Sequence, residues 1–379
     1  MIIYTHLCKS LHHLKCVGRI SPFLSSFNSI RCISCNASDD QHSFVVTYLT
    51  NSCGVSPNSA LSISKSLNFK TSDQPDSVLA CLKKNGFSKP QILKIIQTRP
   101  TVLLSNPEKT LLPKIEFFHS KGFSSLVTVK VLSVCPQILH SSLEKRLIPA
   151  FSAIKSILRD DDLVIRAITR SPNILLSHLY FYVIPNIKIL RDNGFPESSI
   201  AWFLVYHPRD LFTSSDSLTK SIDKVKELGL KPSQKIFSIA IQVMRSLSKS
   251  AWERKSDIYK KWGWSELEIL AAFKKFPGCM ATSEKKITAM MDYYINKMGL
   301  DSSYIARSPS LIGFSFEKRV VPRCSVIQVL LSKGLVTSTS LSSRLNITEE
   351  VFLCRFVIPY QKEIPHLLKL YQKKLNDPN

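Results

Sequence analysis

Prolines recur along this chain at a nearly constant interval, and this periodicity constrains the fold more than any other feature. The first four are 36 residues apart, a methionine, Met244, occupies the next position, and the last two follow at intervals of 33 and 32. Since the chain has 20 prolines in 379 residues, about one position in 19 is proline, and chance agreement is negligible. The proline series consists of Pro100, Pro136, Pro172, Pro208, Pro277 and Pro309.

Other residue types keep the same phase. The residue three positions after each member of the series is apolar, and so is the residue four positions before it. Glycine occurs fourteen positions before the member in four units, and a second proline occurs thirteen positions after it in four units. These second prolines are Pro113, Pro149, Pro185 and Pro322. A fixed period of this length predicts tandem supersecondary units that stack on one another.

The first unit indicates a pair of helices. Ile92, Ile95 and Ile96 form one apolar face of a helix over residues 88–98. This helix should end before Pro100, because the residue that precedes a proline disfavours the α conformation. A short apolar turn follows it.

The second helix of the unit has start and stop signals of its own. Asn106 predicts an N-cap, with Pro107 at the first helical position, and Gly122 predicts the residue just past the end. In the second unit, Ser141 and Glu144 predict a capping box at the corresponding place.

The second prolines fall inside this second helix. An interior proline removes a hydrogen bond and bends a helix, so a bend repeated in successive units predicts a curved superhelix. The alternative is that Pro113 marks a later start of the helix.

The predicted fold is all-α: a curved superhelical solenoid of about seven tandem helix pairs with a period of about 36 residues. We expect a disordered organellar transit peptide over residues 1–40 and a helical extension or degenerate repeat over 41–77. The solenoid itself would span 78–340, and a C-terminal helical cap would span 341–379.

The charge balance indicates a polyanionic partner. The chain has 51 Lys and Arg against 28 Asp and Glu, a net charge of +23, and residues 1–40 contribute only +2 of it. Charge spread over a folded body predicts a surface that binds nucleic acid or an anionic membrane. No run of 18 apolar residues occurs, so we expect no membrane-spanning helix.

The first 38 residues have the composition of a targeting segment. They contain no acidic residue and are rich in serine, with four basic residues. This is typical of an organellar transit peptide, for which we expect the mitochondrion first and the chloroplast as the alternative. An N-terminus without a targeting role is the other interpretation.

Signals of catalysis or metal binding are weak. The sequence has no glycine-rich nucleotide-binding motif, no phosphate loop and no metalloprotease or hydrolase motif, so we predict no enzyme, no cofactor and no small-molecule substrate. Cys32 and Cys35 form the only close cysteine pair, without a second pair at zinc-site spacing. The acidic run 160–162 is interpreted as a solvated loop and N-cap, so no metal site is predicted.

Basic residues recur nine and ten positions after the proline series, early in the second helix. Five of seven units have one, and in a stacked array they would form a ridge along a phosphate backbone. The alternative is an ordinary solvated helix face. This basic column consists of Lys109, Lys145, Arg146, Arg254, Lys286, Lys318 and Arg319.

Two further sets have competing interpretations. Basic residues just before the prolines (Arg99, Arg170, Lys275 and Arg307) would bind phosphates or, as we favour, cap the carbonyls of the first helix. The aromatic residues Trp252, Tyr259, Trp262 and Trp264 alternate with basic ones, which suits base stacking. Aromatic residues at helical spacing in a repeat protein more often form the core, which is the interpretation we prefer.

The repeated motif resembles the mitochondrial transcription termination factor (mTERF) family, specifically its plant branch. The resemblance rests on Arg99–Leu104 and Ser171–Leu176, on the stretch Ser250–Pro277, and on Pro322–Val326 followed by Leu330–Gly334. It extends over residues 44–372. The sequence departs from the motif at Met244, Ser221 and Asp257, which makes the middle units the least typical.

This resemblance implies a half-ring solenoid with a basic groove in mitochondria or plastids. It implies roles in organellar transcription termination or initiation, through binding to double-stranded DNA, with RNA processing or intron splicing as the alternative. The function predicted is therefore a non-catalytic, monomeric nucleic-acid-binding regulator of transcription, with no membrane partner. A helical-repeat scaffold for protein interactions is the alternative, and an even spread of the charge would favour it.

Overall fold

The computed structural model describes residues 36–176, 179–337 and 341–376, which form two compact units divided between Leu218 and Thr219. Within the described ranges every regular element is a helix, which confirms the all-α prediction. The division falls inside the segment 78–340. Most of the predicted transit peptide and the Cys32–Cys35 pair lie outside the described residues.

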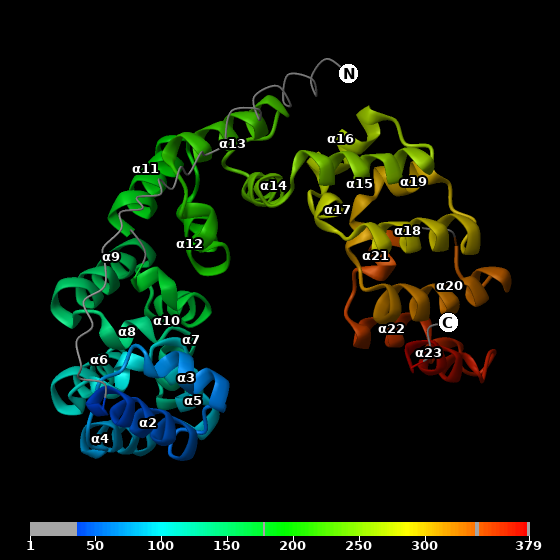
Figure 1. The fold of residues 1–379 in the computed structure, drawn as a ribbon. Helices are drawn as coiled ribbons and strands as arrows, with labels where there is room; N and C mark the ends of the chain where they lie inside the picture. Colours follow the sequence, from blue (N-terminus) through cyan, green and yellow to red (C-terminus); the bar gives the residue numbers. More distant parts are fainter. Residues whose placement is uncertain (1–35, 177–178, 338–340, 377–379) are drawn as a thin grey trace, which may run out of the picture. The chain divides into compact units, whose positions relative to one another are not determined.

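The N-terminal unit is a succession of helices in sequence order (Figure 1, blue to green). Its elements are α2 (Asn36–Asn51), α3 (Pro57–Ser64), α4 (Asp73–Lys84), α5 (Lys89–Thr98), η1 (Pro100–Leu104), η2 (Pro107–Leu111), α6 (Leu112–Ser120), α7 (Ser125–Val134), α8 (Gln137–His140), η3 (Leu143–Leu147), α9 (Ile148–Leu158), α10 (Asp161–Arg170), η4 (Pro172–Leu175), η5 (Leu179–Val183), α11 (Ile184–Asp192), α12 (Glu197–Tyr206), η6 (Pro208–Leu211) and the start of α13 (Ser215–Glu227).

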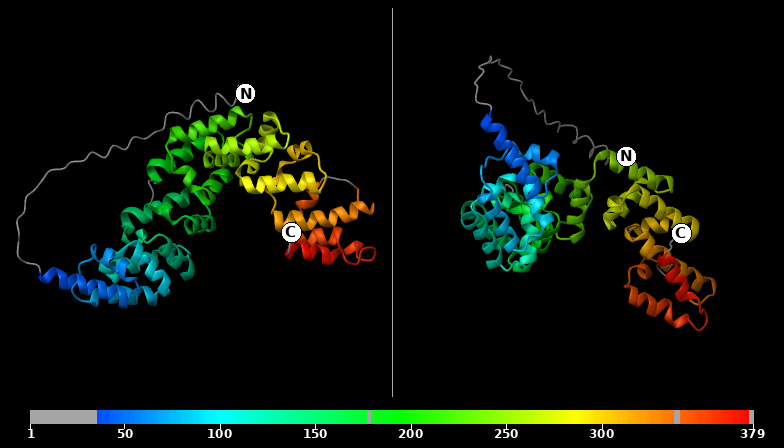
Figure 2. Two further views of the ribbon diagram at one scale, coloured as in Figure 1. Left: turned by 45° about the vertical axis from the view of Figure 1, so that its right-hand side comes forward. Right: turned by 60° about the horizontal axis from the view of Figure 1, so that its bottom comes forward.

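The C-terminal unit continues the same pattern, and Figure 2 shows both units from two further directions. After α13 it contains α14 (Lys235–Ser246), α15 (Lys249–Lys261), α16 (Glu266–Lys275), α17 (Gly278–Ala281), α18 (Glu284–Asp292), η7 (Tyr293–Lys297), α19 (Ser302–Arg307), η8 (Pro309–Gly313), η9 (Phe316–Val320), α20 (Val321–Ser332), α21 (Leu341–Leu345), α22 (Glu349–Phe356), η10 (Ile358–Tyr360) and α23 (Leu367–Asn376).

Each repeat consists of helix A, a short proline turn and helix B. The proline turn is the short helix that begins at or just after a member of the proline series: η1, α8, η4, η6, α17 and η8. Helices A of successive repeats pack on one another, α5 on α7, α7 on α10 and α10 on α12; in the C-terminal unit, α14 packs on α16 and α16 on α19. The helix boundaries therefore follow the proline series as predicted.

The apolar positions of the repeat form the core. The helix A residues Ile96, Leu132, Ile168 and Leu204 are fully buried, and so are the corresponding residues of the C-terminal unit, Ala240 and Phe273. A single helix pair cannot cover both of its apolar faces, so each repeat is stabilised by its neighbours.

Glycines end several of the B helices in the left-handed conformation, as the sequence predicted. Gly122 has φ +86° and Gly86 has φ +87°, angles that cost little without a Cβ atom. In the second repeat the same function falls to Arg159, which has φ +55° and is the one described non-glycine residue with a positive φ.

A π-turn precedes each second proline. The π-turns η2, η3, η5 and η9 each lead directly into an α-helix whose second residue is Pro113, Pro149, Pro185 or Pro322. In the first repeat the N–H of Leu112 donates to the carbonyl of Pro107, five residues back. The proline thus stands in the first turn of an α-helical segment, where its missing N–H costs little. Helix B nevertheless begins at the Asn106 cap, so the second proline lies inside the helix, as first predicted, and does not mark a later start.

The predicted capping box of the second repeat is wrong by one residue. The N-cap is Ser142, whose hydroxyl accepts from the N–H of Lys145 at 3.1 Å. The hydroxyl of Ser141 donates instead to the carbonyl of Gln137 at 3.0 Å. The cap lies six residues after the series proline, as it does at Asn106 and at Ser283, so the predicted box was placed one residue too early.

The repeat that lacks a series proline also lacks the proline turn. Met244 lies inside α14, which continues to Ser246, and Ser248 directly caps α15 by accepting from the N–H of Ala251 at 3.1 Å. Without a proline nothing blocks the α conformation at this point, so helix A continues. The departure at Met244 thus has a structural counterpart.

Buried polar side chains join successive repeats at one carbonyl position. Lys114 Nζ donates to the carbonyl of Leu139, and Lys255 Nζ donates to that of Met280 at 2.7 Å. Leu139 and Met280 each lie three residues after a member of the proline series. Asn186 donates to the equivalent carbonyl of Leu211 at 3.0 Å. These bonds satisfy buried carbonyls that the short proline turns leave without a helical partner.

Candidate nucleic-acid interface

The basic column lies where helix B begins, and the local sequence explains why. The residue six positions after the series proline is the N-cap, and the lysine nine positions after it donates its backbone N–H to that cap. Asn106 accepts from Lys109 at 2.9 Å, and Ser315 accepts from Lys318 at 3.4 Å. The lysine side chain therefore projects from the first turn of the helix. A cation is unfavourable there with respect to the helix dipole, so its recurrence is not explained by helix stability.

Exposure divides the basic column into two groups. Lys109, Lys145, Arg146, Arg254 and Lys318 are exposed, whereas Lys286 and Arg319 are half-buried. The guanidinium of Arg319 lies 5.7 Å from the centre of the Phe314 ring, which accounts for its partial burial.

Arg254 and Lys286 of the basic column are held by partners in the next repeat. Arg254 Nε donates to Glu284 Oε1 at 2.9 Å, an ion pair between successive repeats. Lys286 Nζ donates to the carbonyl of Gly313 at 3.3 Å, and burial lowers the pKa of this lysine. Both side chains contribute to packing between repeats, which reduces the charge they present to an incoming polyanion.

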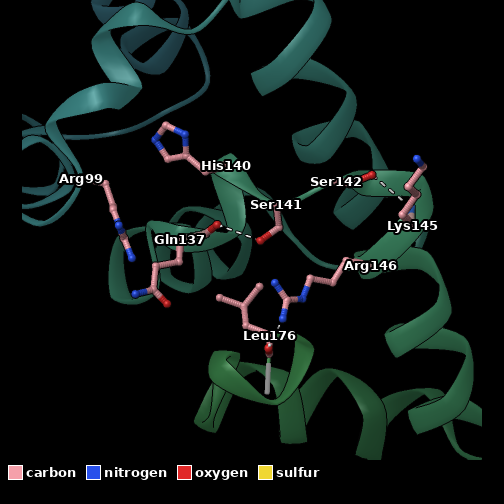
Figure 3. Close-up of a pocket in the computed structure, with 8 residues that line it drawn as sticks. All are labelled: Arg99, Gln137, His140, Ser141, Ser142, Lys145, Arg146 and Leu176. Carbon is pink, nitrogen blue, oxygen red and sulfur yellow. Dashed lines mark hydrogen bonds between the residues drawn. The ribbon is translucent and has the colours of Figure 1, made fainter. Parts of the chain in front are cut away.

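A pocket in the N-terminal unit brings two of the predicted sets together. It has a volume of about 660 Å³ and is lined by Arg99, Gln137, His140, Ser141, Ser142, Lys145, Arg146 and Leu176. None of these eight described lining residues is acidic. We call it the basic pocket (Figure 3).

The side chains of the basic pocket come from three consecutive repeats. Arg99 precedes the first proline turn, His140 ends the second, and Arg146 begins the following helix B and donates to the carbonyl of Leu176 at 3.1 Å. In Figure 3 the guanidinium groups of Arg99 and Arg146 reach toward the pocket on either side of Gln137, while the ammonium of Lys145 points away from them. Two guanidinium groups that line one pocket without a carboxylate suit an oxyanion such as phosphate.

His140 adds a titratable group to the basic pocket. Desolvation by neighbouring groups lowers the pKa of its imidazole, and the positive charges of Lys114 and Arg99 lower it further. Its Nε2 lies 3.3 Å from the hydroxyl of Thr101. The ring is therefore mainly neutral at pH 7, and a bound anion would favour its protonation.

The basic residues before the prolines do not cap their own helices as we had expected. Arg99 lines the basic pocket, and the guanidinium of Arg170 lies 4.9 Å from the centre of the Tyr206 ring. Lys275 Nζ donates to the carbonyl of Arg307, at the end of helix A in the next repeat, at 3.3 Å. Because the proline turn is short, the side chain of Lys275 can reach the end of helix A in the next repeat.

Two of the four aromatic residues at 252–264, Tyr259 and Trp264, belong to the core, which was the preferred interpretation, while Trp252 and Trp262 are half-buried. Tyr259 and Trp264 are buried and stacked with ring centres 4.5 Å apart. Tyr259 donates to the carbonyl of Cys279 at 2.9 Å, and Trp264 donates to Ser302 at 3.0 Å. They are therefore not a surface on which bases could stack.

The acidic run 160–162 stabilises the start of α10. Asp160 caps this helix by accepting from the N–H of Leu163 at 2.8 Å, and Asp161 pairs with Lys155 at 2.8 Å. Among the described residues no group of three or more potential metal ligands comes together. In the same part of the chain, no helix has the length and apolar character needed to cross a membrane.

An exposed run of aromatic side chains in the third repeat was not predicted from the sequence. Tyr180, Phe181 and Tyr182 lie in the π-turn η5, with 59%, 77% and 40% of their surfaces exposed. Phe181 and Tyr182 stand nine and ten residues after Pro172, the positions of the basic column. Their position in the repeat can be read from the sequence, but they are not basic and so do not belong to the basic column.

Comparison with known proteins agrees with the repeat architecture. The family model of mTERF proteins matches residues 79–209 and 151–353. A curated relative is the chloroplastic transcription termination factor MTERF8 of Arabidopsis thaliana, which is 24% identical over 168 residues. That match covers 44% of this chain and spans a third (33%) of the length of the relative. Since the family model covers well over half of the chain, this protein is a member of the mTERF family.

Proposed function

We propose that this protein is a non-catalytic, nucleic-acid-binding regulator of organellar transcription. The observation that carries the proposal is the basic pocket, which Arg99 and Arg146 line without an acidic neighbour among its lining residues. The recurrence of exposed lysines at the start of helix B extends this cationic surface beyond one repeat. Membership in the mTERF family and the net charge of +23 support the same function.

Duplex DNA is the ligand that the family resemblance favours, and organellar RNA is the alternative. The protein would act without a cofactor, as a monomer that holds the phosphate backbone through Lys and Arg side chains. Such contacts fix position along the nucleic acid rather than sequence. Termination or initiation of transcription would follow from a protein that stays bound in the path of the polymerase.

The direct test is the salt dependence of binding. If about five phosphates are neutralised, log K should fall against log salt with a slope of about −4.5 on duplex DNA, or about −3.5 on single strands. Arg146→Ala and Arg319→Ala should each flatten the slope by about one unit and weaken binding similarly for all sequences. Lys83→Ala, an exposed lysine of α4 outside the basic column, is the matched control.

The outcome decides between two classes of protein. A chain that binds neither duplex nor single strands in a salt-dependent way would rule out the proposed function and favour a protein-interaction scaffold. Unchanged slopes in both arginine variants, with helical content intact, would remove the basic column from the interface.

The organelle and the physiological target require a separate experiment. We propose that residues 1–38 direct import, so a fluorescent fusion without them should stay in the cytosol. The location of the intact fusion distinguishes mitochondrion from plastid. Crosslinking in that organelle, followed by sequencing of the bound nucleic acid, identifies the target and separates DNA from RNA.

A further inference from the structure

Three consecutive aromatic side chains at the start of a helix are unusual on a protein surface. We call Tyr180, Phe181 and Tyr182 the aromatic segment. Phe181 exposes 77% of its surface, whereas Tyr259 and Trp264 of the C-terminal unit are buried. Exposed apolar side chains that gather in one place commonly mark a binding site.

The register of the repeat indicates what the aromatic segment binds. Phe181 is nine residues after Pro172, as Lys109 is after Pro100 and Lys145 is after Pro136. All three lie in π-turns that begin helix B. The third repeat therefore presents an aromatic ring at the position where its two predecessors present an ammonium group.

The basic pocket ends close to the aromatic segment. Arg146 donates to the carbonyl of Leu176, which lines the pocket, and Leu176 precedes Tyr180 by four residues. Four residues span at most about 14 Å, so both features lie within reach of one short oligonucleotide. A cationic pocket beside exposed rings is the combination that binds the phosphate and the base of one strand.

We propose that the N-terminal unit binds unpaired nucleotides, with phosphates in the basic pocket and bases stacked on the aromatic segment. This inference rests on the proposed function and narrows its ligand to single-stranded nucleic acid. Paired bases offer only their edges in the grooves, because their faces are covered by their neighbours in the stack. An exposed ring can stack only on a base whose face is open.

The test compares a short single-stranded oligonucleotide with the duplex of the same sequence, using fluorescence anisotropy and the full chain. Phe181→Ala should weaken single-strand binding by about 5-fold to 150-fold, the range that one stacked base contributes, and leave duplex affinity within about twofold. Phe181→Trp should retain the affinity. Leu126→Ala is the matched control, because Leu126 is an apolar side chain of the same unit with 84% of its surface exposed.

The salt dependence distinguishes stacking from charge. Phe181→Ala should lower the single-strand affinity without changing its salt slope, because a phenyl ring releases no counterion. Arg146→Ala should flatten that slope by about 0.7 unit. The proposal is supported if Phe181→Ala changes only the affinity and Arg146→Ala also changes the salt slope.

Three outcomes would overturn it. Phe181→Ala could weaken single-strand binding no more than Leu126→Ala does, it could weaken duplex binding equally, or it could abolish only self-association or binding to a protein. In each case a wild-type chain that binds nucleic acid with a steep salt slope would leave the proposed function intact. A wild-type chain that binds no nucleic acid at all would refute both.

Discussion

The ammonium group of Lys114 donates a hydrogen bond to the backbone carbonyl of Leu139, which lies 25 residues later in the next repeat. Only 4% of the surface of Lys114 is exposed, and its Nζ also donates to the carbonyl of Thr110 at 2.9 Å. Burial lowers the pKa of this lysine. The net charge of the chain therefore includes cations that hold repeats together and do not face a ligand.

Replacement of this lysine should destabilise the N-terminal unit. Lys114→Met keeps the length of the side chain but leaves the Leu139 carbonyl buried without a donor, which should cost about 1–3 kcal/mol of unfolding free energy. Urea denaturation followed by circular dichroism measures this loss. Lys109→Met, an exposed lysine one turn earlier, should change stability by less than about 0.5 kcal/mol. Equal effects of the two substitutions would contradict the structural importance of the Lys114 bond.

A glycine at position 159 should stabilise the protein. Arg159 ends α9 with φ +55°, a conformation that costs roughly 1 kcal/mol for a residue with a Cβ atom. Arg159→Gly should therefore raise the unfolding free energy by about 0.5–1 kcal/mol, as measured by thermal or urea denaturation. Arg159→Lys removes the guanidinium but keeps the strain, so it should leave stability unchanged. A loss of stability in the glycine variant would show that the arginine side chain matters more than the backbone angle.

The ion pair between Arg254 and Glu284 should limit the binding of nucleic acid. Glu284→Gln frees the guanidinium, so we expect tighter binding and a salt slope that is steeper by up to about one unit. Glu253→Gln is the control, since it removes the same charge from the neighbouring α15 but leaves the Arg254 pair in place. If both variants gain affinity equally, the effect comes from net charge and not from the release of Arg254.

The pH dependence of binding should depend on His140. Burial and the positive charges of Lys114 and Arg99 lower its pKa in the free protein, so the ring is neutral above that pKa. A phosphate in the basic pocket offsets these charges and raises the pKa. Protons are then taken up on binding, and affinity should increase as the pH falls through this range.

The size of that increase follows from the change in pKa. Each unit by which the phosphate raises the pKa of His140 strengthens binding by up to tenfold at low pH. Anisotropy titrations between about pH 5.5 and 8 measure it. His140→Gln should abolish the dependence, whereas His119→Gln, an exposed histidine of the same unit, should retain it. A profile that is identical in all three proteins would exclude His140 from the binding site.

The proline series was sufficient to predict the repeat because its signals are local. Pro100 restricts the residue before it, and Gly122 adopts a positive φ at a chain reversal, whatever the rest of the molecule does. The same holds for the cap formed by Asn106. The fold class and most of the helix boundaries therefore follow from the sequence.

The candidate site could be predicted only in part because its partners are remote. Arg254 is paired with Glu284, thirty residues later, and the basic pocket combines Arg99 with Arg146 from another repeat. The sequence pattern of one repeat does not specify which side chains of the next repeat will contact its basic residues. Phe181 was not predicted for a different reason, since it is an uncharged residue at a position where most of the other repeats have lysine.

The π-turns have a consequence for how the repeats should be aligned. A π-turn holds one residue more than an α-helical turn, and one residue corresponds to a rotation of about 100° around the helix axis. A buried residue of helix B accordingly lies eleven positions after the proline where a π-turn is present, at Leu111, Leu147, Val183 and Val320, but ten positions after it at Leu218 and Ile287.

Residues with the same number within the repeat thus face two different directions. Lys109, Lys145 and Lys318 stand on π-turns and are exposed, whereas Lys286 stands on a plain α-helix and is turned toward the next repeat. An alignment by the proline alone mixes these two orientations in one column. A code that assigns nucleotides to repeats of this kind would have to be written separately for repeats with and without the second proline.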